Sequence, residues 1–193
     1  MPDNIIVLIG KSGAGKDTLA SDLCKNFDKF NMCVSTTSRP IRVNEVQGIH
    51  YNFVSSDEFK EKIKNSEMIE YRSYETVFNG AKDIWYYGTE KSAIKNGSIL
   101  VLDLGGLINL KSALKDVNIV SLYLDCSDEE RKRRAQERGS FCSEEWNRRL
   151  IDDNIKFCIN EIRKHVNYIV DADGSAEVVF NNVKKLLNLK LGD

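Results

Sequence analysis

The sequence is poor in several residue types and segment types, and each shortage excludes a class of protein. It has two prolines and two histidines, and its five cysteines show no C-x-x-C spacing. These shortages argue against loose linkers, a zinc site and a disulfide framework, and favour reduced, mostly buried thiols. No apolar run approaches the roughly 18 residues of a membrane span, and the run at 5–9 is too short for a signal-peptide core. We therefore expect a cytoplasmic protein.

An excess of basic charge is also missing. Twenty-eight Lys and Arg residues face 29 Asp and Glu residues, which gives a formal net charge of -1. Global charge therefore predicts no nucleic-acid partner and no anionic membrane surface, and any basic function must be local. With 193 residues, 41% of them hydrophobic, the chain is long enough for one well-buried core.

Short apolar runs alternate with helical patterns along the chain. Helical spacing is clear over 16–27, where apolar residues recur every four positions, and again over about 176–189. This order predicts an α/β fold with a central, mostly parallel sheet. The runs with the length of strands are 5–9, 99–104, 118–124 and 168–170.

Two stretches depart from this alternation. Residues 36–90 mix short β-like pieces with one helix around 57–64, which predicts an inserted α+β subdomain. Residues 144–166 predict one long amphipathic helix whose apolar stripe packs against the core. The stripe consists of Leu150, Ile151, Ile155, Ile159 and Ile162.

Two helix starts have capping-box spacing, in which a serine precedes a glutamate by three residues. One is Ser55 with Glu58. The other is Ser127 with Glu130, at the start of the strongly charged stretch SDEERKRRAQERG. We expect both pairs to begin helices.

The stretch GKSGAGKDT fits the phosphate-loop pattern G-x-x-x-x-G-K-[ST] in all but its last letter, Asp17. In such a loop, glycines let backbone N–H groups turn toward phosphates, and the helix start adds partial positive charge. An apolar strand precedes this stretch and a helical pattern follows it, so we expect a nucleotide site rather than a simple turn. The predicted ATP-binding residues here are Gly10, Ser12, Gly13, Ala14, Gly15, Lys16, Asp17 and Thr18.

Two carboxylates are candidates to hold magnesium, both through water. Asp17 stands where a hydroxyl normally helps to hold the ion, and Thr18 still offers a hydroxyl. Asp103 ends the apolar run SILVLD, where a second-strand carboxylate would lie. Taken alone, Asp103 is more often a strand-end or helix-capping residue, but the phosphate loop favours the metal role.

A basic cluster follows in the last third of the chain. Arg131, Arg134 and Arg138 share one helix face, and Arg148 and Arg149 come after a short loop. Arginine forks could neutralise the charge that phosphoryl transfer concentrates between donor and acceptor. The alternative is a solvated helix in which neighbouring glutamates balance the arginines.

Seven stretches in unbroken order make nearly the whole chain resemble the guanylate kinase family. The resemblance implies a three-layer P-loop fold with a core at 1–35 and 91–193, a monophosphate-binding subdomain at about 36–90 and a lid at about 138–146. It also implies transfer of phosphate from ATP, with Mg²⁺, to GMP or dGMP. The stretches are STTSRPIR, EVQGIHYNFVSSDEF, EMIEY, YYGT, VLDL, RRAQERG and NRRL.

The resemblance assigns roles by position. In the acceptor site, Arg39, Arg42, Tyr51 and Tyr87 would cradle the monophosphate, while Glu70 would accept hydrogen bonds from N1–H and N2–H of guanine. Ser35 and Thr89 would donate to its O6. The acceptor-binding set is Ser35, Arg39, Arg42, Tyr51, Glu70, Tyr87, Thr89 and Asp103. The phosphate-transfer set is Lys16, Arg134, Arg138 and Arg149.

The chain departs from the family pattern at points that bear on the base. Gly105 replaces a second aspartate directed at the guanine, and the segment between Glu70 and Tyr87 is longer than usual. Asp171 stands where an asparagine often lies beside the adenine, so we place it in the ATP site.

Rival hypotheses remain beside the guanylate kinase. One is a kinase for another nucleoside monophosphate, and another is a non-catalytic guanylate-kinase-like module that binds proteins. A P-loop ATPase switch leaves the acceptor set unexplained. The sequence leaves a monomer or a homodimer open.

Overall fold

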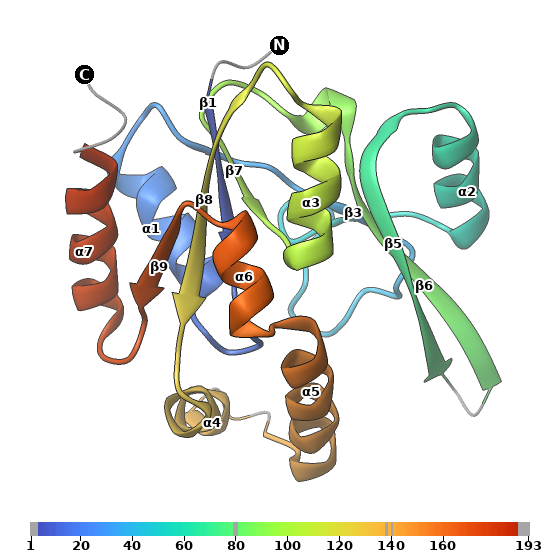
Figure 1. The fold of residues 1–193 in the computed structure, drawn as a ribbon. Helices are drawn as coiled ribbons and strands as arrows, with labels where there is room; N and C mark the ends of the chain where they lie inside the picture. Colours follow the sequence, from blue (N-terminus) through green and yellow to red (C-terminus); the bar gives the residue numbers. More distant parts are fainter. Residues whose placement is uncertain (1–3, 79–80, 138, 140, 189–193) are drawn as a thin grey trace.

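The computed structural model describes residues 4–78, 81–137, 139 and 141–188. At its centre lies a five-stranded sheet with the order β2-β7-β1-β8-β9, in which every pairing is parallel (Figure 1). The four predicted strands are confirmed with shifts of one to three residues at their ends, whereas the two-residue β2 was not predicted. The strands are β1 (Asn4–Ile9), β2 (Asn31–Met32), β7 (Ser98–Val101), β8 (Asn118–Asp125) and β9 (Tyr168–Asp171).

Helices cover both faces of this sheet and complete the three layers predicted from the sequence (Figure 1). Successive residues of a strand point to opposite faces, so Ile6 and Leu8 of β1 join one core cluster while Ile5, Val7 and Ile9 join the other. The first cluster packs under α1 (Lys16–Asn26) and α7 (Ala176–Asn188), and the second under α3 (Leu104–Ala113) and α6 (Ile159–His165). Apolar residues on both faces explain why β1 reads as a continuous hydrophobic run.

A second sheet, with the order β4-β3-β6-β5, lies beside the first (Figure 1). Its helix α2 (Ser56–Lys64) begins at the predicted capping box, where Glu58 N donates to Ser55 Oγ at 3.1 Å and Ser55 N donates to Glu58 Oε2 at 2.7 Å. Buried Phe59 of α2 stacks on Tyr86 of the sheet at 5.4 Å between ring centroids. The strands are β3 (Thr36–Thr37), β4 (Asn52–Phe53), β5 (Met68–Phe78) and β6 (Ala81–Glu90).

The segment between Glu70 and Tyr87 that is longer than usual forms most of a β-hairpin. Strands β5 and β6 pair in antiparallel register from Met68 with Glu90 to Phe78 with Ala81. The hairpin projects past the rest of the second sheet (Figure 1). Its added length is therefore regular structure that places side chains near α3 and α5 (Ser143–Lys156).

The single long helix predicted over 144–166 is wrong. The chain leaves the helical conformation at Phe157, so α5 and α6 are separate helices. Buried Phe157 packs against Tyr123 of the central sheet at 6.1 Å, while α5 extends away from the sheet beside α4 (Asp128–Glu137) (Figure 1). Two residues of the predicted stripe, Ile151 and Ile155, are consequently 63% and 76% exposed, and only Ile162 of that stripe is fully buried.

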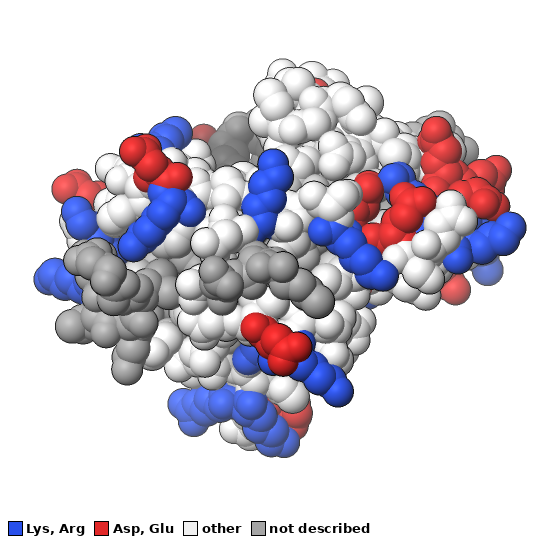
Figure 2. Space-filling view, turned by 90° about the horizontal axis from the view of Figure 1, so that it is seen from above, with Lys and Arg blue, Asp and Glu red and all other residues white. Residues whose placement is uncertain are grey.

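The remaining expectations from composition have mixed outcomes. All five cysteines are free, but Cys142 and Cys158 are exposed, so the expectation of mostly buried thiols is wrong for those two. Acidic and basic side chains are interleaved on the face shown in Figure 2, in keeping with the net charge of -1. Within the described part of the chain, no helix combines the length and the apolarity that crossing a bilayer requires.

Candidate active site

The phosphate loop connects β1 to α1 at the carboxyl end of the central sheet. Gly13 and Gly15 have φ angles of 83° and 93°, a left-handed conformation that side chains with a Cβ rarely adopt. A Cβ on Gly13 would also lie 3.2 Å from the carbonyl oxygen of Arg131. The lysine at the start of α1 folds back over the loop, where Lys16 Nζ donates to Gly10 O at 2.8 Å and to Lys11 O at 3.0 Å. Its ammonium group is therefore held at the centre of the loop.

A buried ion pair anchors the loop from below. Arg131 of α4 is fully buried and contacts Asp153 of α5, which is 6% exposed, at 2.9 Å. Both residues bind Ser12: Arg131 Nη1 donates to Ser12 O at 2.7 Å, and Ser12 N donates to Asp153 Oδ2 at 2.9 Å. Sequence reasoning noticed Arg131 only as one of a basic face and missed Asp153, because 22 residues separate the partners.

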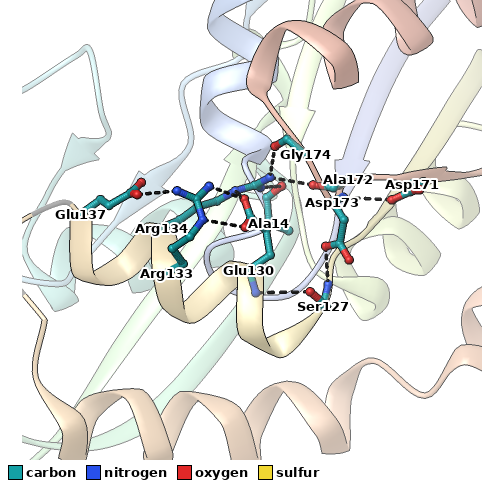
Figure 3. Close-up of polar contacts among 10 residues, drawn as sticks. All are labelled: Ala14, Ser127, Glu130, Arg133, Arg134, Glu137, Asp171, Ala172, Asp173 and Gly174. Carbon is teal, nitrogen blue, oxygen red and sulfur yellow. Dashed lines mark hydrogen bonds and ion pairs between the residues drawn. The ribbon is translucent and has the colours of Figure 1, made fainter.

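Arg134 joins the phosphate loop to the turn after β9 (Figure 3). Its guanidinium donates to Ala14 O at 3.2 Å, Ala172 O at 2.7 Å and Gly174 O at 2.8 Å. Its Nε also donates to Glu130 at 2.9 Å. With these contacts Arg134 fixes the backbone beside the loop and presents its charge there.

The capping box predicted at Ser127 is only half formed. Glu130 N donates to Ser127 Oγ at 3.3 Å, but the Glu130 carboxylate binds Arg133 and Arg134 instead of the backbone N–H of Ser127 (Figure 3). Hydrogen bonds from Arg133, with further ones from Arg134, lower the pKa of Glu130 to about 2. The Ser127 N–H donates to Asp173 at 2.8 Å.

A cavity of about 300 Å³ opens beside the loop. Thr18 lines it, whereas Asp17 is exposed in the first turn of α1. Asp171 lies in a separate hollow with Asp173, to whose backbone N–H it is bonded at 2.9 Å. The cavity lining is Ala14, Gly15, Thr18, Leu19, Arg133, Arg134, Glu137, Gly174, Ser175, Ala176 and Val179.

In the sequence, the predicted transfer residues Arg138 and Arg149 and the predicted lid all fall between the end of α4 and the middle of α5. Arg149 is half-buried on α5, one helical turn before Asp153. Arg138 lies outside the described residues, as does part of the predicted lid at 138–146. The ion pair under the loop therefore also fixes the helix that carries Arg149.

The second sheet carries a cationic group between aromatic rings. Arg39 is 4% exposed and forms a two-pronged ion pair with Glu45 at 2.8 and 3.0 Å. Its guanidinium lies 5.6 Å from the ring centroids of both Tyr51 and Phe53. Hydrogen bonds from Arg39 lower the pKa of the Glu45 carboxyl. Exposed Arg42 donates its backbone N–H to the same Glu45 carboxylate. Sequence reasoning missed Glu45 as the partner of these two arginines.

Three tyrosines in mutual contact connect Arg39 to Asp103 at the start of α3. Tyr87 lies 6.0 Å from Tyr51 and 5.5 Å from Tyr74, in edge-to-face contacts. Tyr74 Oη donates to Asp103 Oδ2 at 2.9 Å. Burial raises the pKa of the Tyr51 hydroxyl, and the negative charge of Asp17 raises it further.

The predicted base-binding carboxylate is buried. Glu70 is 5% exposed and accepts a hydrogen bond from Thr89 Oγ1 at 2.7 Å. Burial raises the pKa of the Glu70 carboxyl. Ser35 is half-buried and its carbonyl oxygen accepts a hydrogen bond from Asn52 N at 2.9 Å.

Sequence reasoning missed Arg72, which lies beside Glu70 on the hairpin. Its Nη2 is 4.0 Å from Glu70 Oε2, and its Nη1 forms an ion pair with Asp103. Asp103 also caps α3, since its Oδ1 accepts a hydrogen bond from Gly106 N at 3.0 Å. Two sequence features indicated a change at this place, namely the longer segment between Glu70 and Tyr87 and the glycine at position 105. Neither feature identifies Arg72 as the residue involved.

Comparison with known proteins identifies this arrangement. The family model described as guanylate kinase matches residues 3–189. A guanylate kinase of Helicobacter pylori is 32% identical over 192 residues, which cover 96% of this chain and 88% of the relative. A guanylate kinase of Clostridium perfringens is 30% identical over 181 residues, covering 82% of this chain and 80% of the relative.

The fold is likewise shared with a solved structure. The crystal structure of guanylate kinase from Anaplasma phagocytophilum superposes with a TM-score of 0.69 and covers 100% of this chain and 88% of the other at 22% identity. The phosphate loop, the buried Glu70 and the arginine-rich α4 thus occur on the fold that the sequence resemblance predicted. From the family match and the relatives together, the chain belongs to the guanylate kinase family.

Proposed function

We propose that the protein transfers the γ-phosphoryl group of ATP to GMP or dGMP, giving ADP and GDP or dGDP. The observation that carries the proposal is the buried pair of Glu70 and Thr89, in a chain whose buried Arg39 is held by Glu45 against the ring of Tyr51. A buried carboxylate suits a base, and a guanidinium oriented in advance suits a phosphate.

The acceptor phosphate would bind at the Arg39 end. Arg39 is already oriented by Glu45 and by stacking between two rings, so its fork is fixed before any ligand arrives. A phosphate dianion would share or replace Glu45 as the acceptor, with Arg42 and the hydroxyls of Tyr51 and Tyr87 as further donors. We propose residues 36–90 as the acceptor subdomain on this basis.

The base would bind at the Glu70 end. The carboxylate can accept two hydrogen bonds from the adjacent N1–H and N2–H groups of guanine, and its burial makes those bonds strong because water does not compete. Thr89 and Ser35 would supply hydroxyls toward O6. Burial raises the pKa of the Glu70 carboxyl, so only the ionised fraction can bind guanine in this way.

The donor ATP would lie along the loop and the cavity beside it. Lys16 would leave the carbonyls of Gly10 and Lys11 and bind the outer phosphates, while Arg134 holds the cavity wall at Ala14 and Gly174. We assign Gly10, Ser12, Gly13, Ala14, Gly15 and Thr18 to the same site. The N–H of Ser12 donates to Asp153, so Ser12 serves the site chiefly by fixing the loop.

Magnesium fits the donor set at Asp17. This carboxylate is exposed at the start of α1, and hard oxygen ligands with retained waters suit Mg²⁺. Asp103 already accepts bonds from Gly106, Tyr74 and Arg72, so it can act on the ion only through water. Bound to the phosphates of ATP, the ion would neutralise charge that builds up during transfer.

Catalysis by these residues is positioning and charge neutralisation without a covalent intermediate. Arg134 lies on α4, Arg149 lies on α5, and Arg138 is the first residue of the proposed lid at 138–146. Closing the lid would bring cations to the transferring group and exclude water. The test is a coupled ADP-release assay with GMP, dGMP, AMP, CMP, UMP and dTMP as acceptors and Lys16→Ala as control. Negligible turnover of GMP beside a good rate on another base would refute the guanine assignment.

The assay also separates an enzyme from a non-catalytic module. If no acceptor is phosphorylated and ATP with Mg²⁺ does not bind at millimolar concentration, the protein-binding alternative replaces the kinase. The retention of Lys16, Arg134, Arg138 and Arg149 supports the kinase, because guanylate-kinase-like modules that bind proteins tend to lose these residues.

A further inference from the structure

The Arg72 guanidinium packs against two glycines and lies beside Glu70, the group proposed to bind the base. Gly105 and Gly106 lie in the first turn of α3, directly against the Arg72 guanidinium. A Cβ on Gly105 would lie 2.6 Å from Arg72 Nη1, and a Cβ on Gly106 would overlap Nη2. The guanidinium therefore occupies space that any side chain at these two positions would need.

This arrangement places a positive charge where the family usually has a negative one. The family usually has an aspartate at the position of Gly105, directed at the guanine, and here a cation fills that space. Arg72 is also held by its ion pair with Asp103 and lies 4.0 Å from Glu70 Oε2. Its side chain is 24% exposed, so the guanidinium is not sealed inside the protein. An acceptor of hydrogen bonds has become a donor.

We propose that Arg72 is a specificity-determining residue that admits a purine nucleotide with a carbonyl at C2, xanthosine monophosphate, into the acceptor site. The inference rests on the proposed function, since it takes Glu70 as the group that binds N1–H of the base. Next to N1–H, guanine presents the N2 amino group, a donor that a second carboxylate would accept. Xanthine presents O2 there, an acceptor that suits a guanidinium.

The ionic form of xanthine strengthens this match. The xanthine of a nucleotide carries an acidic proton on N3, where guanine carries none, and the negative charge left by its loss is shared between N3 and O2. The planar fork of an arginine can donate to two such neighbouring atoms at once, as it does to a carboxylate. A pocket containing only the carboxylates of Glu70 and Asp103 would repel that anion, and Arg72 offsets the repulsion.

The experiment compares kcat/KM for xanthosine monophosphate and GMP in matched variants. The wild-type protein is expected to phosphorylate both nucleotides. Arg72→Met removes the donors at similar length and should lower the ratio of xanthosine monophosphate to GMP at least tenfold. Arg72→Met combined with Gly105→Asp should lower the ratio further, because it restores a carboxylate facing N2. Lys82→Gln, on the exposed edge of the same hairpin, should leave the ratio unchanged.

The outcomes separate this inference from the proposed function. Turnover of GMP without turnover of xanthosine monophosphate, or a ratio in Arg72→Met within twofold of the wild type, overturns the role of Arg72 alone. Turnover of neither nucleotide overturns the proposed function. If Arg72→Met does not fold, as judged by circular dichroism, Arg72→Lys decides: it keeps the charge without the fork, and an unchanged ratio contradicts the inference.

Discussion

The ion pair beneath the phosphate loop gives the sharpest test of how this fold holds its site. Arg131 is fully buried, Asp153 is 6% exposed, and both bind the backbone of Ser12. Asp153→Ala would leave the guanidinium without its buried partner and would remove the acceptor of the Ser12 N–H. Breaking a buried pair by removing one partner costs about 3–5 kcal/mol.

Asp128 sets where in that range the loss should fall. It binds Arg131 Nη2 at 2.6 Å and would still do so in the variant, so we expect the lower end, about 3 kcal/mol. For a chain of this size, each 1 kcal/mol changes Tm by about 2–4 °C, which predicts a drop of roughly 6–12 °C. Arg131→Met should cost a similar amount, because it leaves the Asp153 carboxylate buried without a cation.

The double variant Arg131→Met with Asp153→Ala distinguishes pairing from packing. Removing both charges leaves no buried ion unpaired, because the side chain of Asp128 is partly exposed, so the loss should be at least about 2 kcal/mol smaller than the sum of the single losses. Urea unfolding followed by circular dichroism measures all three, and the KM for ATP reports whether the loop has moved. Additive losses, or a loss below about 1 kcal/mol for Asp153→Ala, would refute the anchoring role.

Four further predictions concern the loop, the base carboxylate and a helix start. In the coupled assay, Lys16→Ala should reduce kcat/KM by more than a hundredfold, whereas Asp17→Ser should reduce it by less than tenfold. Similar losses in both variants would contradict a working metal site in which Asp17 replaces the usual hydroxyl. Gly13→Ala should destabilise the fold by about 1–2 kcal/mol in urea unfolding because its φ is 83°, and an unchanged midpoint would show that the loop relaxes. Burial raises the pKa of Glu70 above 4.5, so its folded form keeps a proton that the unfolded form has lost. Stability should therefore fall as pH rises from 4.5 through the raised pKa, and KM for GMP should fall over the same window; Glu70→Gln should abolish both trends, and trends that persist would assign them to another group. Ser55→Ala should cost about 1 kcal/mol in thermal unfolding, with no change in KM, whereas a shift in KM would implicate α2 in the site.

Local pattern predicted most of the architecture. The run from Ile5 to Ile9 is apolar on both faces because helices cover both sides of β1, and its length and continuity are visible without any structure. The glycine and lysine spacing of the loop is equally local, since a strand, a tight turn and a helix start must follow one another in the chain. The capping box of Ser55 and Glu58 was predicted correctly for the same reason, because its two residues are close together in the chain.

Patterns failed where distant contacts decide the outcome. The apolar spacing of 144–166 is helical throughout, yet Phe157 packs against Tyr123 and ends α5 there. Ser127 has the right spacing for a capping box, but two arginines compete for Glu130. At Phe157 a tertiary partner outweighed the local preference. At Ser127 the competing arginines are neighbours on the same helix, and distant Asp173 accepts the hydrogen bond from the Ser127 N–H.

Sequence pattern alone predicted four strands of the central sheet, the phosphate loop and the family, because each depends on residues close together in the chain or on their order. Only the tertiary structure placed Asp153 under the loop and Arg72 beside Glu70 and Asp103. The contacts of Arg131 with Asp153 and of Arg72 with Asp103 join strands and helices that are far apart in sequence, and a charged residue alone does not reveal its partner. Burial then gives these few charge pairs their weight, since water no longer screens them.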